Sequence, residues 1–191
     1  MRRSGQVVGT TAEAWLGCSL EADPAPDAIV LRYVAAFGPA TVQDAATWSR
    51  YTGLREVFDR LRPQLRTFRD EAGRELFDVP DSTIPDGDVP APVRFLPEYD
   101  NVLLGHADRR RFVADDFRTR MPYERLGFLG NLLVDGMLAG GWRADGPTLR
   151  VYTVDRLAGG ARAAVEEEGR RLLALLRPGT ENDVAFEAVG T

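Results

Sequence analysis

Arginine is the residue type most able to do chemistry in this chain, because all 24 basic side chains are arginine and lysine is absent. A guanidinium group can hold a phosphate through two parallel hydrogen bonds. Residues 50–74 hold seven arginines against four acids, a local charge of +3 in a chain of net charge −5. This uneven distribution indicates one basic face for nucleic acid, although coding bias in a GC-rich genome explains the arginine content more simply.

The candidate DNA contacts combine this arginine-rich segment with a later arginine run. They are Arg50, Tyr51, Thr52, Arg55, Arg62, Arg66, Arg69, Arg74, Arg109 and Arg110. The alternative interpretation is a solvated surface of ion pairs, since Arg55–Asp59 and Glu56–Arg60 have the i,i+4 spacing. Asp59 on the same helix face would also repel phosphate.

Other reactive side chains form no recognisable catalytic site. Glu98 and Asp100 could serve acid–base or metal chemistry, but no histidine accompanies them, and we favour capping and ion pairing. His106 precedes Asp108, yet no G-x-S-x-G motif supports a hydrolytic triad. Cys18 is the single cysteine and cannot complete a zinc site with one histidine. We therefore predict no catalytic residue, no metal and no cofactor.

Three helices and a hairpin would position the arginine-rich segment. Apolar periodicity predicts a helix over 27–37 with Asp27 as N-cap. A second, short helix follows, with Thr41 as its N-cap and Asp44 at the third position of a capping-box-like pattern. A third helix starts at residue 54 and kinks or ends near Arg62, before Pro63, and a hairpin spans 66–79. This order predicts a winged-helix (helix-turn-helix) module at 27–79, with its third helix in the major groove.

The sequence patterns of the remaining chain predict an α+β protein. Residues 80–92 are a proline-rich linker, and 93–177 read as a small antiparallel β-barrel-like domain with a C-terminal helix over 161–177. Its turns are Asp135-Gly136 and Asp145-Gly146, and residues 178–191 are expected to be a flexible tail. The predicted strands are Val93–Leu96, Gly127–Val134, Met137–Arg143 and Thr148–Val154.

Residues 1–26 form a lead-in arm whose apolar residues have no local helix or strand to bury them. These residues are Val7, Val8, Trp15, Leu16 and Leu20. The arm either folds back on the first helix or exposes a patch for a homodimer partner or a separate N-terminal half. No apolar run suggests a membrane span or a secretory signal, so we expect a cytoplasmic protein.

Two stretches resemble a bacterial winged-helix DNA-binding family that includes DNA glycosylases acting on alkylated bases and interstrand crosslinks. They are Leu31–Ser49, LRYVAAFGPATVQDAATWS, and Val93–Arg111, VRFLPEYDNVLLGHADRRR. The resemblance runs from about Ala14 to Leu176. It implies tandem winged helices followed by a β-barrel-like domain, and this chain resembles the C-terminal half of the longer members.

The resemblance transfers no catalytic residue. The family signature is a Gln-x-Gln or Gln-x-Asp motif, and none of Gln6, Gln43 and Gln64 has either partner two positions later. The sequence thus favours a protein that holds double-stranded DNA without its catalytic motif. Two alternatives stay open. One is a minimal glycosylase acting on alkylated or crosslinked bases, and the other is a non-catalytic regulator that docks protein through the acidic residues 75–100.

Overall fold

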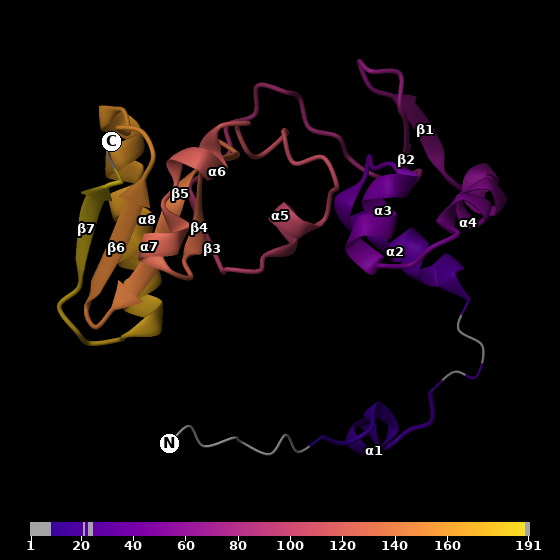
Figure 1. Ribbon diagram of the computed structural model, residues 1–191, viewed down its shortest axis with the longest axis horizontal. Coiled ribbons are helices and arrows are strands. Elements are labelled where there is room, and N and C mark those ends of the chain that lie inside the picture. The colour runs from indigo at the N-terminus through magenta and orange to yellow at the C-terminus, as the bar shows by residue number, and fades with distance from the viewer. Residues whose placement is uncertain (1–8, 21, 23–24, 190–191) are drawn as a thin grey trace.

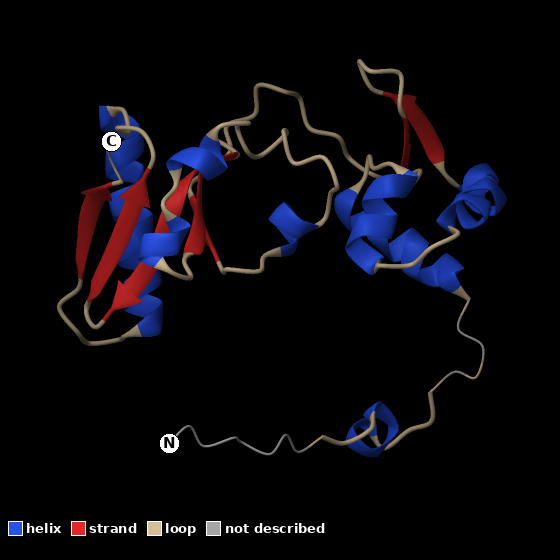
Figure 2. Ribbon diagram, in the orientation of Figure 1, coloured by secondary structure: helices blue, strands red, loops and turns tan. Residues whose placement is uncertain are grey.

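A computed structural model describes residues 9–20, 22 and 25–189, and Figure 1 shows two lobes joined by long loops. A helix lobe carries a hairpin, and a sheet lobe lies at the other end of the molecule (Figure 2). The helix lobe consists of α2 (Pro26–Phe37), α3 (Val42–Ser49), α4 (Leu54–Leu61), the 3-10 turn η1 (Arg62–Gln64), β1 (Arg66–Arg69) and β2 (Glu75–Asp78).

The predicted start and stop signals form as expected, with one exception. Thr41 and Asp44 make a capping box at α3, and the α-helix α4 ends at Leu61, immediately before η1. Gly73 takes the positive φ of 77° in the hairpin turn. The exception is Asp27, which is not an N-cap. Pro26 already opens α2 because its fixed φ suits the first helical position.

One apolar core holds the hairpin against the helices. The apolar side chains of α4 are buried, namely Leu54, Val57, Phe58 and Leu61. The Phe58 ring lies 4.8 Å from the ring of Phe77 on β2. Phe77 also exchanges backbone hydrogen bonds with Ala40, before α3. The two buried aromatic rings make the hairpin more stable than the same hairpin would be if it were exposed to solvent. The hairpin is therefore fixed relative to α4.

The sheet lobe is a mixed five-stranded sheet covered on one face by α8 (Gly159–Leu176). Its order is β3-β4-β5-β6-β7, antiparallel except for the parallel pair β6–β7. Val165 and Leu173 of α8 pack against the buried Leu149 and Val151 of β6. The strands are β3 (Arg94–Leu96), β4 (Gly130–Val134), β5 (Met137–Asp145), β6 (Thr148–Thr153) and β7 (Asp183–Ala188).

Two predictions for this lobe are wrong. The sheet is open and mixed rather than an antiparallel barrel, since β3 and β7 stand at its two ends and do not pair with each other. Residues 178–191 are not a flexible tail throughout, because β7 pairs in register with β6 along its length. The helix α8 explains the parallel pair β6–β7. A helical crossover brings the chain back alongside its starting strand, which makes the new pair parallel.

The segment between the lobes, which we call the connecting segment (residues 97–118), docks on the helix lobe. The Tyr33 hydroxyl donates to the carbonyl of Gly105 at 2.6 Å, and the amide of Ala107 donates to Asp44 at 2.8 Å. The segment includes α5 (Asn101–Leu104) and runs into α6 (Phe117–Arg120), which α7 (Tyr123–Leu126) follows.

The arm contains the short helix α1 (Ala12–Leu16), capped by Thr11. Trp15, Leu16 and Leu20 are 79%, 62% and 54% exposed, so these side chains do not fold back on α2. Val7 and Val8 lie outside the described residues. Across the described part of the chain, no helix combines the length and the apolar character needed to cross a membrane.

Candidate nucleic-acid interface

The ten predicted contact residues lie in five places. Three arginines of α4, η1 and β1 lie around Glu75 and form what we call the basic face (Arg55, Arg62 and Arg69). Arg66 lies on the other face of β1, since side chains alternate along a strand. Three residues form the turn between α3 and α4, where Arg50 adopts a left-handed backbone and all three side chains are exposed (Arg50, Tyr51 and Thr52). Two lie where the hairpin meets the connecting segment (Arg74 and Arg110). Arg109 lines a separate cavity.

Three guanidinium groups of α4 and β1 form no ion pair with the carboxylates of the described residues. They belong to Arg55, Arg66 and Arg69, all exposed. Arg66 donates to the carbonyl of Ser82 at 3.2 Å and lies over the Phe68 ring, while Arg69 donates to the carbonyl of Gly73 at 3.1 Å. These contacts leave other N–H groups of each guanidinium available for a phosphate.

Arg62 is the exception on this face. Its guanidinium donates to both oxygens of Glu75, at 2.7 and 2.9 Å, and so joins η1 to β2. This pairing holds the pKa of the Glu75 carboxyl below its usual value, and the charges of Arg69 and Arg55 act in the same direction. The arginines therefore surround one carboxylate. Arg62 positions the hairpin rather than standing free for DNA as the sequence suggested.

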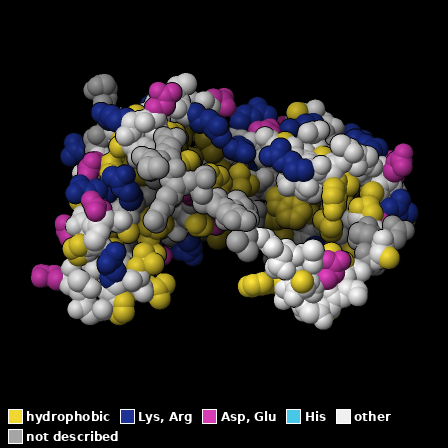
Figure 3. Space-filling model, turned by 60° about the horizontal axis from the view of Figure 1, so that its bottom comes forward, with side chains coloured by type: hydrophobic (Ala, Val, Ile, Leu, Met, Phe, Trp, Pro, Cys, Tyr) yellow, Lys and Arg dark blue, Asp and Glu magenta, His cyan; other side chains and the backbone are white. Residues whose placement is uncertain are grey.

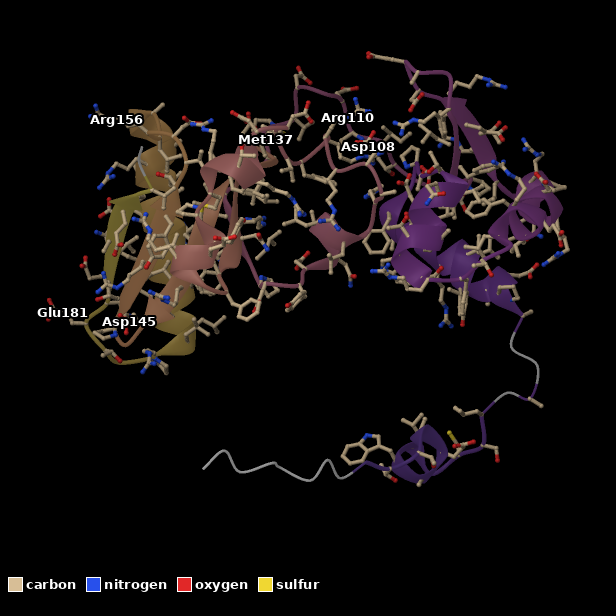
Figure 4. The ribbon with its side chains drawn as sticks, in the orientation of Figure 1. Asp108, Arg110, Met137, Asp145, Arg156 and Glu181 are labelled. Carbon is tan, nitrogen blue, oxygen red and sulfur yellow. The ribbon has the colours of Figure 1, made fainter. Side chains whose placement is uncertain are left out.

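Arg74 and Arg110 are also held by carboxylates. Arg74 lies 2.6 Å from Asp70 and 3.1 Å from Asp108, and Arg110 lies 2.7 Å from Asp108. The Arg110 and Arg74 guanidinium groups keep the pKa of Asp108 well below its usual range. Figure 4 places Asp108 and Arg110 on the loop beside the helix lobe. These ion pairs fasten the hairpin to the connecting segment, so neither arginine is freely offered to phosphate.

Arg109 belongs to a site that sequence reasoning did not find. It is partly buried and lines a cavity of about 670 Å³ between the connecting segment and the sheet lobe. Arg118, Tyr123 and Phe128 line the same cavity. No sequence pattern brings these residues together, because they lie on a loop, on α6 and α7, and just before β4.

Two of the acidic and histidine candidates, Asp100 and His106, have structural roles, whereas the Glu98 side chain makes no ion pair with a described residue. Asp100 caps α5 by accepting from the amide of Val102 at 2.8 Å. His106 is 4% exposed, and its Nε2 lies 3.0 Å from the carbonyl oxygen of Phe37. Asp108, two positions later, pairs with Arg74 and Arg110. Within residues 9–20, 22 and 25–189, no cluster of three side chains suitable for a metal ion occurs.

Comparison with known proteins assigns the chain to a class of DNA repair proteins. A family model for AlkZ-like DNA glycosylases matches residues 1–175, so the chain belongs to the AlkZ-like DNA glycosylase family. The fold is similar to that of the DNA glycosylase AlkZ from Streptomyces sahachiroi, with a TM-score of 0.69 and 23% identity. The match covers 92% of this chain and 50% of the other, so this chain spans half of that structure. No curated protein matches the sequence.

Proposed function

We propose that this chain grips double-stranded DNA through its helix lobe, as the DNA-holding half of a glycosylase-like repair protein. The lobe then acts as a winged helix, with α4 in the major groove and the β1–β2 hairpin beside the phosphate backbone. The observation that carries the proposal is that Arg55 and Arg69 on the basic face form no ion pair with a described carboxylate. Membership in a DNA glycosylase family agrees with a DNA substrate.

The rigidity of this face supports the proposal. The Phe58–Phe77 contact and the Arg62–Glu75 pair fix the hairpin relative to α4, so the free guanidinium groups need little reordering on binding. Preorganised groups lose less conformational entropy when a ligand arrives. Glu75 and Asp59 lower the positive potential of the face, so we expect moderate affinity that falls steeply with salt.

Fluorescence anisotropy of a labelled duplex at low and moderate salt tests this function. Arg55→Ala and Arg69→Ala should each weaken binding, since each removes one phosphate contact. Each should also flatten the salt slope, the slope of the logarithm of the binding constant against the logarithm of the salt concentration, by about one unit. Arg156→Ala is the matched control, because Arg156 is exposed, has no ion pair with a described carboxylate and lies in the sheet lobe (Figure 4).

The proposal fails if the wild type does not bind duplex even at low salt, where phosphate contacts are strongest. It also fails if Arg156→Ala weakens binding as much as the basic-face variants. That result would show diffuse attraction to arginine rather than a defined surface.

A further inference from the structure

The cavity beside Arg109 has the size and the lining of a ligand site. Its volume of about 670 Å³ lies within the usual range for small-molecule pockets. Figure 3 shows the molecule hollowed between its lobes, with hydrophobic side chains inside and arginines near the upper edge. The cavity shares no lining residue with the basic face, so a ligand here would be distinct from a duplex on α4.

Two arginines, Arg109 and Arg118, line this cavity without an ion pair to a described carboxylate. Neither Arg109 nor Arg118 forms a hydrogen bond or an ion pair through its side chain with the described residues. Burial lowers the pKa of Arg109, and the charge of Arg118 lowers it further, so the two guanidinium groups repel each other. An anion between them would relieve this repulsion. A phosphate suits them best because guanidinium binds it through paired hydrogen bonds.

Aromatic side chains supply a second binding feature. Tyr99 and Phe128 line the cavity and are 70% and 77% exposed, which is unusual for rings of this size. Tyr123 is half-buried, and within the described chain its hydroxyl makes no hydrogen bond. Exposed rings at a cavity suit a flat, aromatic ligand, since a nucleobase stacks on such rings whatever its sequence.

Acceptor groups complete the lining. The side-chain amide of Asn131 donates to the carbonyls of Pro97 and Glu98, at 3.1 and 3.3 Å, which leaves its own oxygen free to accept. The Glu98 carboxylate has no ion pair with a described residue. Both groups can accept from the exocyclic amine of cytosine or adenine. Glu98 also repels an anion, so the phosphate belongs at the arginines.

We propose that this cavity binds one unpaired nucleotide, with its phosphate held by Arg109 and Arg118 and its base stacked on Tyr99 and Phe128. The base must be unpaired because a ring can cover its face only after it leaves the duplex stack. The same chemistry exists in a free nucleoside monophosphate and in a nucleotide unit of a single strand. The proposal does not depend on duplex binding by the basic face.

Anisotropy of a short fluorescein-labelled oligodeoxycytidylate provides the test. Phe128→Ala and Arg109→Gln should each weaken its binding by about tenfold, the usual effect of losing one stacked base or one phosphate clamp. Arg125→Gln on α7 is the matched control, since Arg125 is exposed and does not line the cavity. If Arg109→Gln loses its native circular dichroism spectrum, Arg118→Gln takes its place, because Arg118 is exposed.

Deoxycytidine monophosphate added as a competitor shows whether the ligand is a free nucleotide or a nucleotide unit of a single strand. Displacement that becomes complete as the nucleotide concentration is raised well above its own Kd shows that the cavity takes the free nucleotide. Retention of the strand at those concentrations shows a strand-specific site, and both outcomes support a nucleotide pocket. Equal binding by wild type, Phe128→Ala and Arg118→Gln would overturn the proposal. Arg55→Ala should weaken duplex binding and leave single-strand binding unchanged, so the two proposals fail independently.

Discussion

Asp44 is buried, and its two carboxylate oxygens bind two different parts of the chain. One oxygen accepts from the amide and the hydroxyl of Thr41, at 2.8 and 2.7 Å. The Asp44 amide in turn donates to the Thr41 hydroxyl oxygen at 3.1 Å, which completes the capping box that the sequence predicts. The other accepts from the amide of Ala107 in the connecting segment at 2.8 Å. The spacing of Thr41 and Asp44 revealed the first role. The second joins residues 63 positions apart, and no local pattern could reveal it.

We predict that Asp44→Asn destabilises the protein by about 1–3 kcal/mol, since an amide cannot accept all three hydrogen bonds and leaves a buried donor unpaired. Burial alone would raise the pKa of Asp44, but the hydrogen bonds from Thr41 and Ala107 lower it below 3.8. A lowered folded-state pKa stabilises the protein above the unfolded value, and this contribution is lost as the pH falls through the folded value.

Urea unfolding at neutral pH and at a series of pH values below 4 measures both effects. The variant should be less stable at neutral pH, and its stability should fall less steeply with acid than that of the wild type. Asp88→Asn, in the exposed stretch before β3, is the control and should behave as the wild type. Equal acid sensitivity in Asp44→Asn and the wild type would contradict the role assigned to this carboxylate.

Glu75 sits among the arginines of the basic face, so its charge should oppose DNA binding. We predict that Glu75→Gln raises duplex affinity several-fold and steepens the salt slope by about one unit, since it frees the charge of Arg62. Anisotropy titrations over a range of salt measure this change. Glu166→Gln, which frees Arg170 on α8, is the matched control. If both substitutions raise affinity equally, net charge explains the effect and the basic face does not.

At the scale of elements, local signals predicted the helix lobe well and the sheet lobe only in part. The apolar periodicity of α4 and the Asp-Gly turns are signals that span only a few residues. The turns form with Asp135, Gly136 and Gly146 at positive φ. The strand β7 is equally short, but the whole of α8 separates it in sequence from its partner strand β6. A parallel pairing leaves no turn signal, so the segment read as a loose tail.

The strand β7 gives a prediction at this scale. Val184 is 8% exposed and packs in the core beneath α8, so Val184→Ala should destabilise the sheet lobe by about 2 kcal/mol. Thermal unfolding followed by circular dichroism measures the loss. Glu181→Ala, exposed in the loop before β7 (Figure 4), should have no measurable effect. A tail without structure would instead make both substitutions neutral.

At the scale of the whole molecule, the connecting segment bridges the two lobes. It reaches the helix lobe through the bond from Tyr33 to Gly105 and the ion pair between Arg74 and Asp108. It reaches the sheet lobe through Asn131, which donates to the carbonyls of Pro97 and Glu98. The cavity beside Arg109 exists because this segment spans both lobes. Such a site depends on contacts between distant residues, which explains why sequence reasoning missed it.

The last prediction concerns base excision by this chain. Hydrolysis of a glycosidic bond needs a polar group that positions water or stabilises the sugar cation beside the extruded base. The Gln-x-Gln and Gln-x-Asp motifs are absent. Gln43 is exposed and donates to Thr47, and Gln64 is exposed in η1, so neither lines the cavity. Gln6 lies outside the described residues.

We therefore expect this 191-residue chain to bind alkylated duplex DNA and to leave abasic sites at the background level. A denaturing gel of alkylated duplex, treated with alkali to cleave abasic sites, measures the outcome. The cavity variant Arg109→Gln identifies the cause if excision does occur. Excision by the wild type that Arg109→Gln abolishes would show that the cavity itself is an active site and that the missing glutamine motif is dispensable. Excision that both proteins perform equally would place the active site elsewhere in the chain.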